Sequence, residues 1–148
     1  MNLIESLQGV TKIFLDTSPV IYYVEAVAGF AEVARLVFVL IGEGQIQGVV
    51  SPVNLAECVT LPIKLGNVNL RQTFTALLTN TEGILLVNID ATIAQRAAEL
   101  RIQYGLKLPD ALQVATAIAA GCEVFLTNDV ALKRVTELQV ILLSELEA

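Results

Sequence analysis

The chain has 148 residues, of which 55% are hydrophobic and 16% are charged, and its net charge is −6. This length suits one domain with a buried core, and the low charged fraction excludes disordered, coiled-coil and low-complexity architectures. The acidic balance argues against broad electrostatic attraction to nucleic acid or to an anionic membrane. Histidine is absent, which excludes a serine hydrolase triad and most zinc or non-haem iron sites. Any catalysis must therefore use carboxylates, cysteines, lysines or hydroxyls.

The sequence predicts a cytoplasmic protein that does not contact membranes. The longest stretch without a charged residue, residues 44–56, is too short to span a bilayer. The N-terminus carries an acid at Glu5 and lacks the basic and apolar regions of a secretory signal. Cys58 and Cys122 lie far apart in apolar segments, so we expect buried free thiols and no disulfide or metal site.

Short β-rich runs alternate with helical stretches, which is typical of an α/β fold. The strands are expected at residues 12–15, 48–50, 83–89, 122–126 and 140–143. Helices are expected from a Ser18 cap to the glycines at 42 and 44, from Ser51 to a break or kink at Pro62, from an Asn69 cap through 78, from Asp90 to Gly105, from Leu108 to Gly121, and briefly up to Val135. Apolar strands separated by helices predict a parallel sheet that is covered on both faces.

Acidic residues stand at the expected carboxyl ends of the strands. Asp16 directly follows the first strand, and Asp129 follows the fourth by two residues. Glu57 lies in the second turn of the helix that the second strand feeds, and Asp110 opens a later helix. Because strand ends meet at one edge of a parallel sheet, these four carboxylates are expected to form one cluster.

Such a cluster predicts a metal site. Neighbouring like charges raise one another's pKa, and a bound hard cation relieves this repulsion. Oxygen ligands suit Mg²⁺ or Mn²⁺, whereas zinc fits poorly without His or Cys. Asp16, Glu57 and Asp110 would hold an ion directly, and Asp129 would complete the site or bind through water.

Carboxylate metal sites commonly support phosphodiester hydrolysis, which needs no histidine. Thr127 and Asn128 are expected to position the scissile phosphate or a water by hydrogen bonding. A bound cation would also offset the negative charge locally, so RNA could still enter an acidic cleft.

Simple structural roles compete with this interpretation. Asp129 and Asp110 could be first-turn acids or caps that the helix dipole favours. Asp90 is best explained as a helix N-cap, since nothing pairs it with the cluster. Asp16 is harder to explain in this way, because Ser18 is the better placed cap. Glu57 lies in a largely apolar helix, where a partly buried acid needs a partner.

Four segments carry a family resemblance: IFLDTSPVIYYVE around Asp16, SPVNLAECVTLP around Glu57, AAELRIQYGLKLPDALQVATAIAAG around Asp110, and VFLTND at Asp129. In this order and in these strand contexts, residues 13–143 resemble a PIN-domain protein, in particular the VapC-type toxin ribonucleases of toxin–antitoxin modules.

The resemblance implies a three-layer α/β/α sandwich with a central parallel sheet, as a single domain over residues 1–148. It implies that Asp16, Glu57, Asp110 and Asp129 bind Mg²⁺ or Mn²⁺ and cleave RNA, with Thr127 as a supporting hydroxyl. It also implies a homodimer and a small cognate antitoxin. Residues 1–11 are an extra N-terminal segment that is expected to pack against a partner or to be disordered. Many relatives carry His where this chain has Gln113, so a hydrogen bond near the site is expected to differ.

Two other functions remain open from the sequence. A receiver-like signalling module would also place an acidic pocket at strand ends, but it needs paired acids after the first strand and a lysine after the last core strand. A catalytically silent PIN-like binding protein would keep the fold without binding divalent ions. Phosphodonor labelling tests the first alternative, and calorimetry with a divalent ion tests the second.

Overall fold

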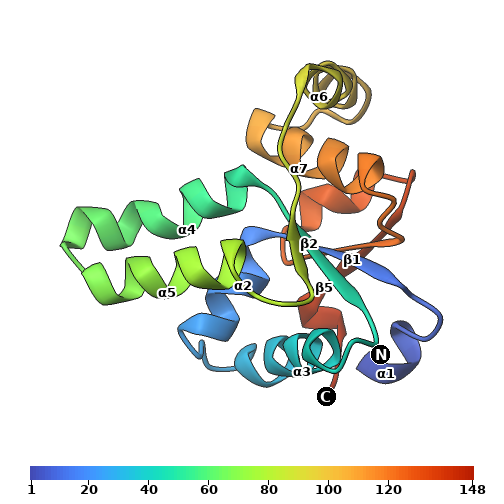
Figure 1. Cartoon of the computed structure of the whole chain (residues 1–148). Helices are drawn as coiled ribbons and strands as arrows, with labels where there is room; N and C mark the ends of the chain where they lie inside the picture. The colour runs from blue at the N-terminus through green and yellow to red at the C-terminus, as the bar shows by residue number, and fades with distance from the viewer.

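The computed structural model describes residues 1–148, and it has one parallel sheet between layers of helices (Figure 1). The five strands lie in the order β3-β2-β1-β4-β5, and every neighbouring pair is parallel. No helix is both long enough and apolar enough to cross a membrane.

The strands are β1 (Lys12–Leu15), β2 (Gln47–Val50), β3 (Ile84–Leu86), β4 (Val124–Thr127) and β5 (Gln139–Leu142). The helices are α1 (Leu3–Ser6), α2 (Thr17–Val24), α3 (Ala31–Gly42), α4 (Pro52–Leu65), α5 (Val68–Thr79), α6 (Ala91–Tyr104) and α7 (Leu108–Ala119), with 3-10 turns η1 (Val130–Arg134) and η2 (Leu143–Glu145). The predicted α/β/α architecture is confirmed.

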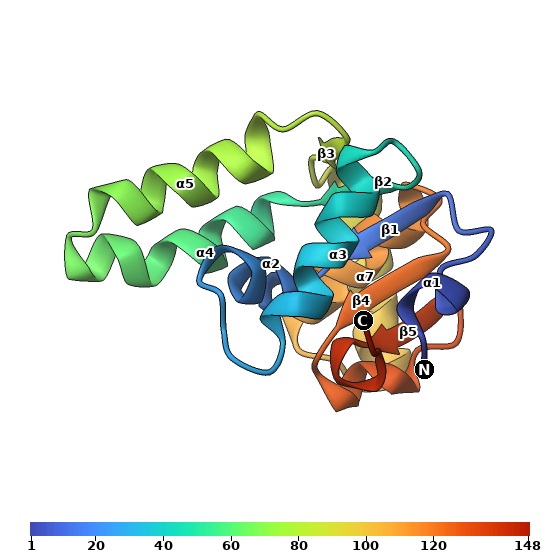
Figure 2. The ribbon, with the colours of Figure 1, turned by 90° about the horizontal axis from the view of Figure 1, so that it is seen from below.

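The central strands are buried on both faces, which explains their continuous apolar sequence. Side chains alternate between the two faces of a strand, so Ile13 and Leu15 of β1 point into one core and Phe14 into the other. The first core includes residues of α3, and the second includes residues of α6 and α7. Figure 2 shows α3 on one side of the sheet, with α7 behind it.

The aromatic pair Phe14 and Phe125 anchors the core beneath α6 and α7. Their rings stack with centroids 5.0 Å apart, and both side chains are fully buried. Phe125→Ala should therefore lower the free energy of unfolding by about 3–5 kcal/mol, because it removes apolar burial and leaves a cavity. Urea unfolding measures the change. Ile102→Ala is the matched control, since Ile102 is 89% exposed and its truncation should change stability by less than about 0.5 kcal/mol. Equal effects of the two substitutions would contradict this packing.

The N-terminus of α2 differs from the prediction. Asp16, not Ser18, is the N-cap, and its Oδ1 accepts a hydrogen bond from the Thr17 backbone N–H at 2.9 Å. The Asp16 N–H donates to the Leu126 carbonyl at 2.9 Å, so Asp16 ends the sheet pairing and begins the helix at the same point. Asp and Ser are equally good N-caps. The sheet contact therefore decides between them.

Three helix boundaries also differ from the prediction. The single helix expected up to residue 42 is two helices, α2 and α3, and the link between them contains Ala26 and Gly29 at positive φ. Pro62 lies inside α4, which continues to Leu65 and packs beside α5 in a hairpin that projects from the body (Figures 1 and 2). Asn67 rather than Asn69 caps α5.

The edge strand β3 has three residues, where a seven-residue strand was expected. It pairs with β2 alone, over Ile84 to Leu86, because the ladder ends where β2 ends at Val50. The Val87 N–H still donates to the Val50 carbonyl at 2.9 Å, and residues 88–89 continue past the end of β2 without forming strand.

Residues 1–11 are ordered and contact the C-terminal part of the same chain, in contrast to the alternative of disorder, whereas the expected partner contact stays a prediction. Leu3 is fully buried, and its N–H donates to the Glu147 carbonyl at 2.9 Å. Asn2 and Glu147 form an isolated parallel bridge. The two ends of the chain therefore lie together (Figure 1).

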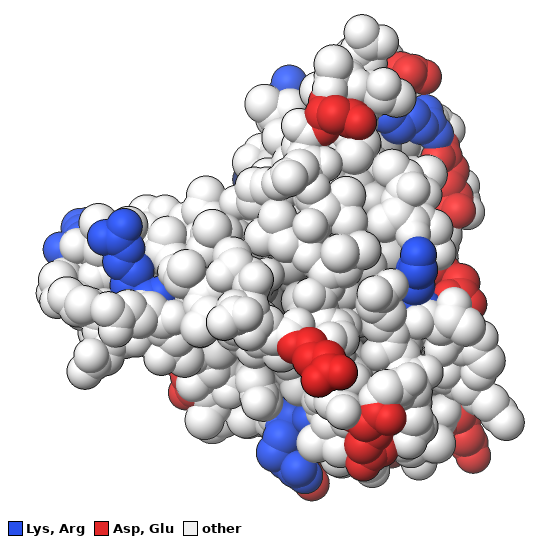
Figure 3. All heavy atoms as spheres, in the orientation of Figure 1, with Lys and Arg blue, Asp and Glu red and all other residues white.

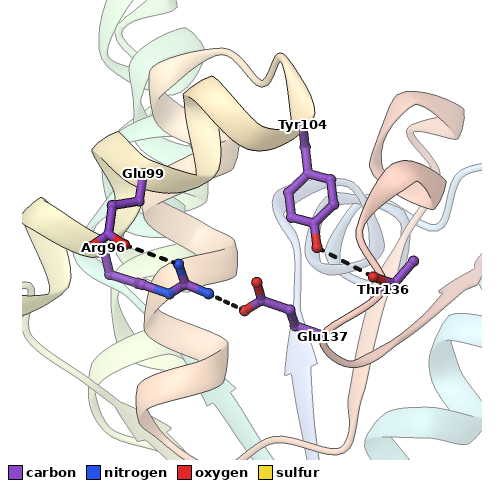
Figure 4. Close-up of polar contacts among 5 residues, drawn as sticks. All are labelled: Arg96, Glu99, Tyr104, Thr136 and Glu137. Atoms are coloured by element: carbon purple, nitrogen blue, oxygen red, sulfur yellow. Dashed lines mark hydrogen bonds and ion pairs between the residues drawn. The ribbon is translucent and has the colours of Figure 1, made fainter.

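A surface cluster joins α6 to the loop between η1 and β5 (Figure 4). Arg96 pairs with Glu137 in that loop and with Glu99 one turn along its own helix, the latter at 3.5 Å. The Tyr104 hydroxyl lies 3.3 Å from the Thr136 hydroxyl. Exposed ion pairs contribute little to stability, so this cluster mainly orients the loop.

Candidate functional site

The sheet has a switch point between β1 and β4. The chain proceeds from β1 to β2 and β3 on one side, and then crosses to β4 and β5 on the other. Ligands of open parallel sheets bind outside the carboxyl ends of the strands at such a point. Asp16 follows β1 and Thr127 ends β4, and the Thr127 hydroxyl donates to Asp16 Oδ2 at 2.7 Å. This bond joins two side chains directly at the switch point.

Asp16 is a buried carboxylate, with 9% of its surface exposed. Burial raises the pKa of Asp16 from 3.8 to about 6, although the hydrogen bonds from Thr127 and Thr17 oppose the rise. The charges of Asp110 and Glu57 raise this pKa further. Carboxylates from two other elements therefore act on Asp16 at the switch point.

Glu57 projects from α4 toward α2. The Thr17 hydroxyl donates to Glu57 Oε1 at 2.7 Å, so Thr17 contacts both Glu57 and, through its N–H, Asp16. Glu57 itself is exposed. Its carboxylate consequently lies at the rim of the site while Asp16 forms the floor.

Asp129 acts on Asp110, and Asp110 in turn acts on Asp16. Burial raises the pKa of Asp110, and the charges of Asp129 and Glu57 raise it further, whereas Lys107 lowers it. Asp129 also caps η1, since its Oδ1 accepts from the Ala131 N–H at 3.0 Å. Asp129 therefore caps a 3-10 turn and also acts on the charge of Asp110.

Thr127, the last residue of β4, and Asn128, which follows it, have different surroundings. Thr127 is fully buried, and its hydroxyl donates to Asp16 while accepting from the Asp129 N–H at 3.1 Å. Asn128 points elsewhere: its amide donates to the Tyr22 hydroxyl at 3.3 Å and its carbonyl accepts from the Ser144 N–H at 3.1 Å. Thr127 thus contacts the acidic group, and Asn128 ties the loop to its surroundings.

Asp90 is a helix cap, as the sequence predicts. Its Oδ1 accepts from the Ile93 N–H at 2.8 Å at the start of α6. Cys58 and Cys122 are buried free thiols, also as predicted. Burial raises the pKa of each thiol to about 12, so neither is a nucleophile at neutral pH.

The PIN domain family model matches residues 13–138, a range that includes all four carboxylates of the site. The chain belongs to the PIN domain family. No curated protein matches the sequence significantly.

Solved structures share the fold of this PIN domain at low sequence identity. A chain of VapBC2 from Rickettsia felis, bound to a DNA fragment from its promoter, has a TM-score of 0.68 and 20% identity, over 89% of this chain and 98% of that one. The Mycobacterium tuberculosis toxin VapC20, described as cleaving the sarcin-ricin loop, has a TM-score of 0.63 and 18% identity, over 76% and 86%. A chain of DNA-bound VapBC from Salmonella typhimurium has a TM-score of 0.65 and 16% identity, over 90% and 98%.

The donor set of this PIN domain fits a hard divalent cation. The four side chains offer only carboxylate oxygens, which Mg²⁺ and Mn²⁺ prefer. Both Asp16 oxygens accept hydrogen bonds from the chain, but a carboxylate oxygen has a second lone pair that remains available. As the side chains stand, no three Asp, Glu, Cys or His residues are arranged to hold an ion. The fit therefore rests on donor chemistry and on the raised pKa values of Asp16 and Asp110, which burial chiefly causes and the neighbouring acids increase.

Sequence reasoning placed Gln113 near the site but missed the group of buried polar side chains to which it belongs. Ser51, Asn54 and Gln113 are all at least 99% buried. The Gln113 amide donates to Asn54 Oδ1 at 2.9 Å, and the Ser51 hydroxyl donates to Gln113 Oε1. A helical spacing signal was available, because Gln113 lies three residues after Asp110 and Asn54 three residues before Glu57.

Proposed function

We propose that this PIN domain is a divalent-metal-dependent endoribonuclease of the VapC type, the cytoplasmic toxin of a toxin–antitoxin module. The observation that carries the proposal is the accumulation of carboxylates at the switch point, where burial and the neighbouring acids raise the pKa values of Asp16 and Asp110. The description of VapC20 as a sarcin-ricin loop cleaving toxin directs the proposal to RNA.

In this proposal, Asp16, Glu57, Asp110 and Asp129 hold Mg²⁺ or Mn²⁺. The cation supplies Lewis-acid polarisation of a phosphodiester and offsets the charge that develops on its oxygens. Thr127 and Thr17 hold Asp16 in its ionised form through their hydrogen bonds at 2.7 Å and 2.9 Å. Thr17 also fixes Glu57 at the rim.

The surface agrees with a substrate that binds chiefly at the acidic site. On the face shown in Figure 3, acidic and basic side chains are both scattered, and some of the basic ones lie at the end of the α4–α5 hairpin. This end carries Lys64 and Arg71. Broad electrostatic attraction to RNA is therefore weak, and the cation is proposed to bring the scissile phosphate to the carboxylates.

A small antitoxin and a second copy of the chain are the proposed protein partners. The similarity in fold to VapBC chains and to a chain of a toxin–antitoxin complex from Klebsiella pneumoniae supports an antitoxin. The α4–α5 hairpin also exposes apolar residues that a partner could cover, namely Leu61, Ile63, Leu65 and Val68. Light scattering of the purified chain measures whether it is a dimer.

Cleavage of structured RNA by the purified chain tests the enzymatic proposal. Fragments should appear with Mn²⁺ or Mg²⁺ and disappear when EDTA removes the ion. Asp110→Asn protein, purified in the same way, controls for contaminating ribonucleases and should be inactive. Cleavage that persists in EDTA would contradict metal dependence. No cleavage together with no divalent-ion binding would favour the silent PIN-like alternative.

A further inference from the structure

Helices α4 and α7 each carry one proposed metal ligand, and a buried amide lies one helical turn from each ligand. Asn54 precedes Glu57 by three residues on α4, and Gln113 follows Asp110 by three residues on α7. Residues three apart lie on the same face of a helix. The amides therefore mark the faces from which the two carboxylates project.

These amides bond to each other across the helix interface. Gln113 Nε2 donates to Asn54 Oδ1 at 2.9 Å, and Gln113 Oε1 accepts from the Ser51 hydroxyl. Asn54 Oδ1 also accepts from the Ser51 N–H at 2.8 Å, which completes a capping box at the start of α4. We call the three side chains Ser51, Asn54 and Gln113 the amide clasp.

The clasp also reaches the strand that carries Asp16. Asn54 Nδ2 donates to the Leu15 carbonyl at 2.8 Å, one residue before Asp16. The end of β1, the first turn of α4 and the first two turns of α7 are thus joined through one buried side chain. No buried side-chain nitrogen or oxygen in the chain lacks a hydrogen-bond partner. Sliding or rotation of the helices would leave buried polar atoms of the clasp without partners, which is energetically costly.

We propose that the amide clasp is a positioning device that sets the spacing of the Asp16, Glu57 and Asp110 carboxylates, and that Gln113 is its link to α7. This inference rests on the proposed function, because it concerns the cation that these carboxylates hold. A helix cap alone would need only Ser51 and Asn54. Gln113 adds nothing to the α4 cap, whose donors are the backbone N–H groups of Ser51 and Val53, but it locks α7 against α4.

Gln113→Met tests the link, since methionine has a similar length and cannot make either hydrogen bond. Calorimetric titration with Mn²⁺ in the absence of RNA should show about 10-fold weaker binding, as is typical when a partner that orients metal ligands is lost. Cleavage at saturating Mn²⁺ should return close to the wild-type rate with an unchanged KM for RNA. Such a recovery would show that the substitution misplaces the metal-binding carboxylates and does not unfold the protein.

Thr116→Val is the matched control. Thr116 is fully buried on the same helix, one turn beyond Gln113, and its hydroxyl donates only to the Leu112 carbonyl at 2.7 Å. It should lose some stability and keep the Mn²⁺ affinity of the wild-type chain. If Gln113→Met does not fold, Gln113→Asn shortens the same side chain by one methylene and tests the same link.

The outcomes distinguish this inference from the proposed function. Wild-type affinity for Mn²⁺ in the Gln113 variants would overturn the clasp, and so would an equal loss of affinity in Thr116→Val. Either result leaves the nuclease proposal intact if the wild-type chain binds Mn²⁺ and cleaves RNA. A wild-type chain that neither binds Mn²⁺ nor cleaves RNA would overturn the proposed function itself.

Discussion

Asp16→Asn should reduce metal-dependent RNA cleavage by at least about 100-fold, since even an outer partner of a metal ligand contributes about 10–100-fold. Asparagine keeps the oxygen that caps α2, where Asp16 accepts from the Thr17 N–H, and it is as good an N-cap as aspartate. The variant thus removes the charge at the switch point without removing the helix cap. Initial rates of cleavage at fixed Mn²⁺ concentration measure the effect.

Asp90→Asn is the control that separates charge at the site from charge elsewhere. Asp90 is also an N-cap, with its Oδ1 accepting from the Ile93 N–H, and the same substitution there changes the same net charge. Its cleavage rate should equal that of the wild-type chain. Similar losses in the two variants would contradict the assignment of Asp16, because they would reflect the overall charge of the protein.

The sequence predicted the elements whose boundary signals are local. Residues 12–15 form β1 as expected. Asp90 caps α6, and Gly105 ends it in the left-handed conformation. Each of these signals acts within one helical turn or one short apolar run, so no knowledge of the remaining chain was required.

The mistaken boundaries depend on contacts that are distant in sequence. Ser18 and Asp16 are both good N-caps by residue type, and pairing of Asp16 with Leu126 of β4 decides between them. Pro62 normally ends a helix, but α4 continues past it because the hairpin with α5 supports the extra turn. Tertiary packing overrode the local preference in both cases.

The acids of the candidate site could be proposed from the sequence because strand ends converge in any parallel sheet. The sequence could not predict which acids influence one another. In the structure, the charges of Asp110 and Glu57 raise the pKa of Asp16. The family resemblance placed Gln113 near the site, but its bond to Asn54 was not predicted, because the two residues are 59 positions apart. Their common distance of one turn from an acid is the sequence signal that links them.

The buried Asp16 carboxyl gives the metal-free protein an unusual dependence on pH. Its pKa is about 6 in the folded chain against an ordinary value of 3.8, so the folded state binds the proton more tightly than the unfolded state. The stabilisation is therefore complete below about pH 4 and is lost as the pH rises through 6. Two pKa units correspond to about 3 kcal/mol, and the raised pKa of Asp110 acts in the same direction.

Urea unfolding of the wild-type chain and of Asp16→Asn between pH 4 and pH 7, both in EDTA, measures this effect. The difference between the two proteins isolates Asp16 from Glu123 and Glu145, whose lowered pKa values act in the opposite direction. The wild-type chain should lose about 2 kcal/mol relative to the variant across this range, most of the full linkage. Mn²⁺ at 100 times its dissociation constant should restore about 2.7 kcal/mol to the wild-type chain at pH 7, because the cation binds the ionised carboxylates, and it should restore much less to the variant. A pH-independent difference would contradict the raised pKa of Asp16 in the folded chain.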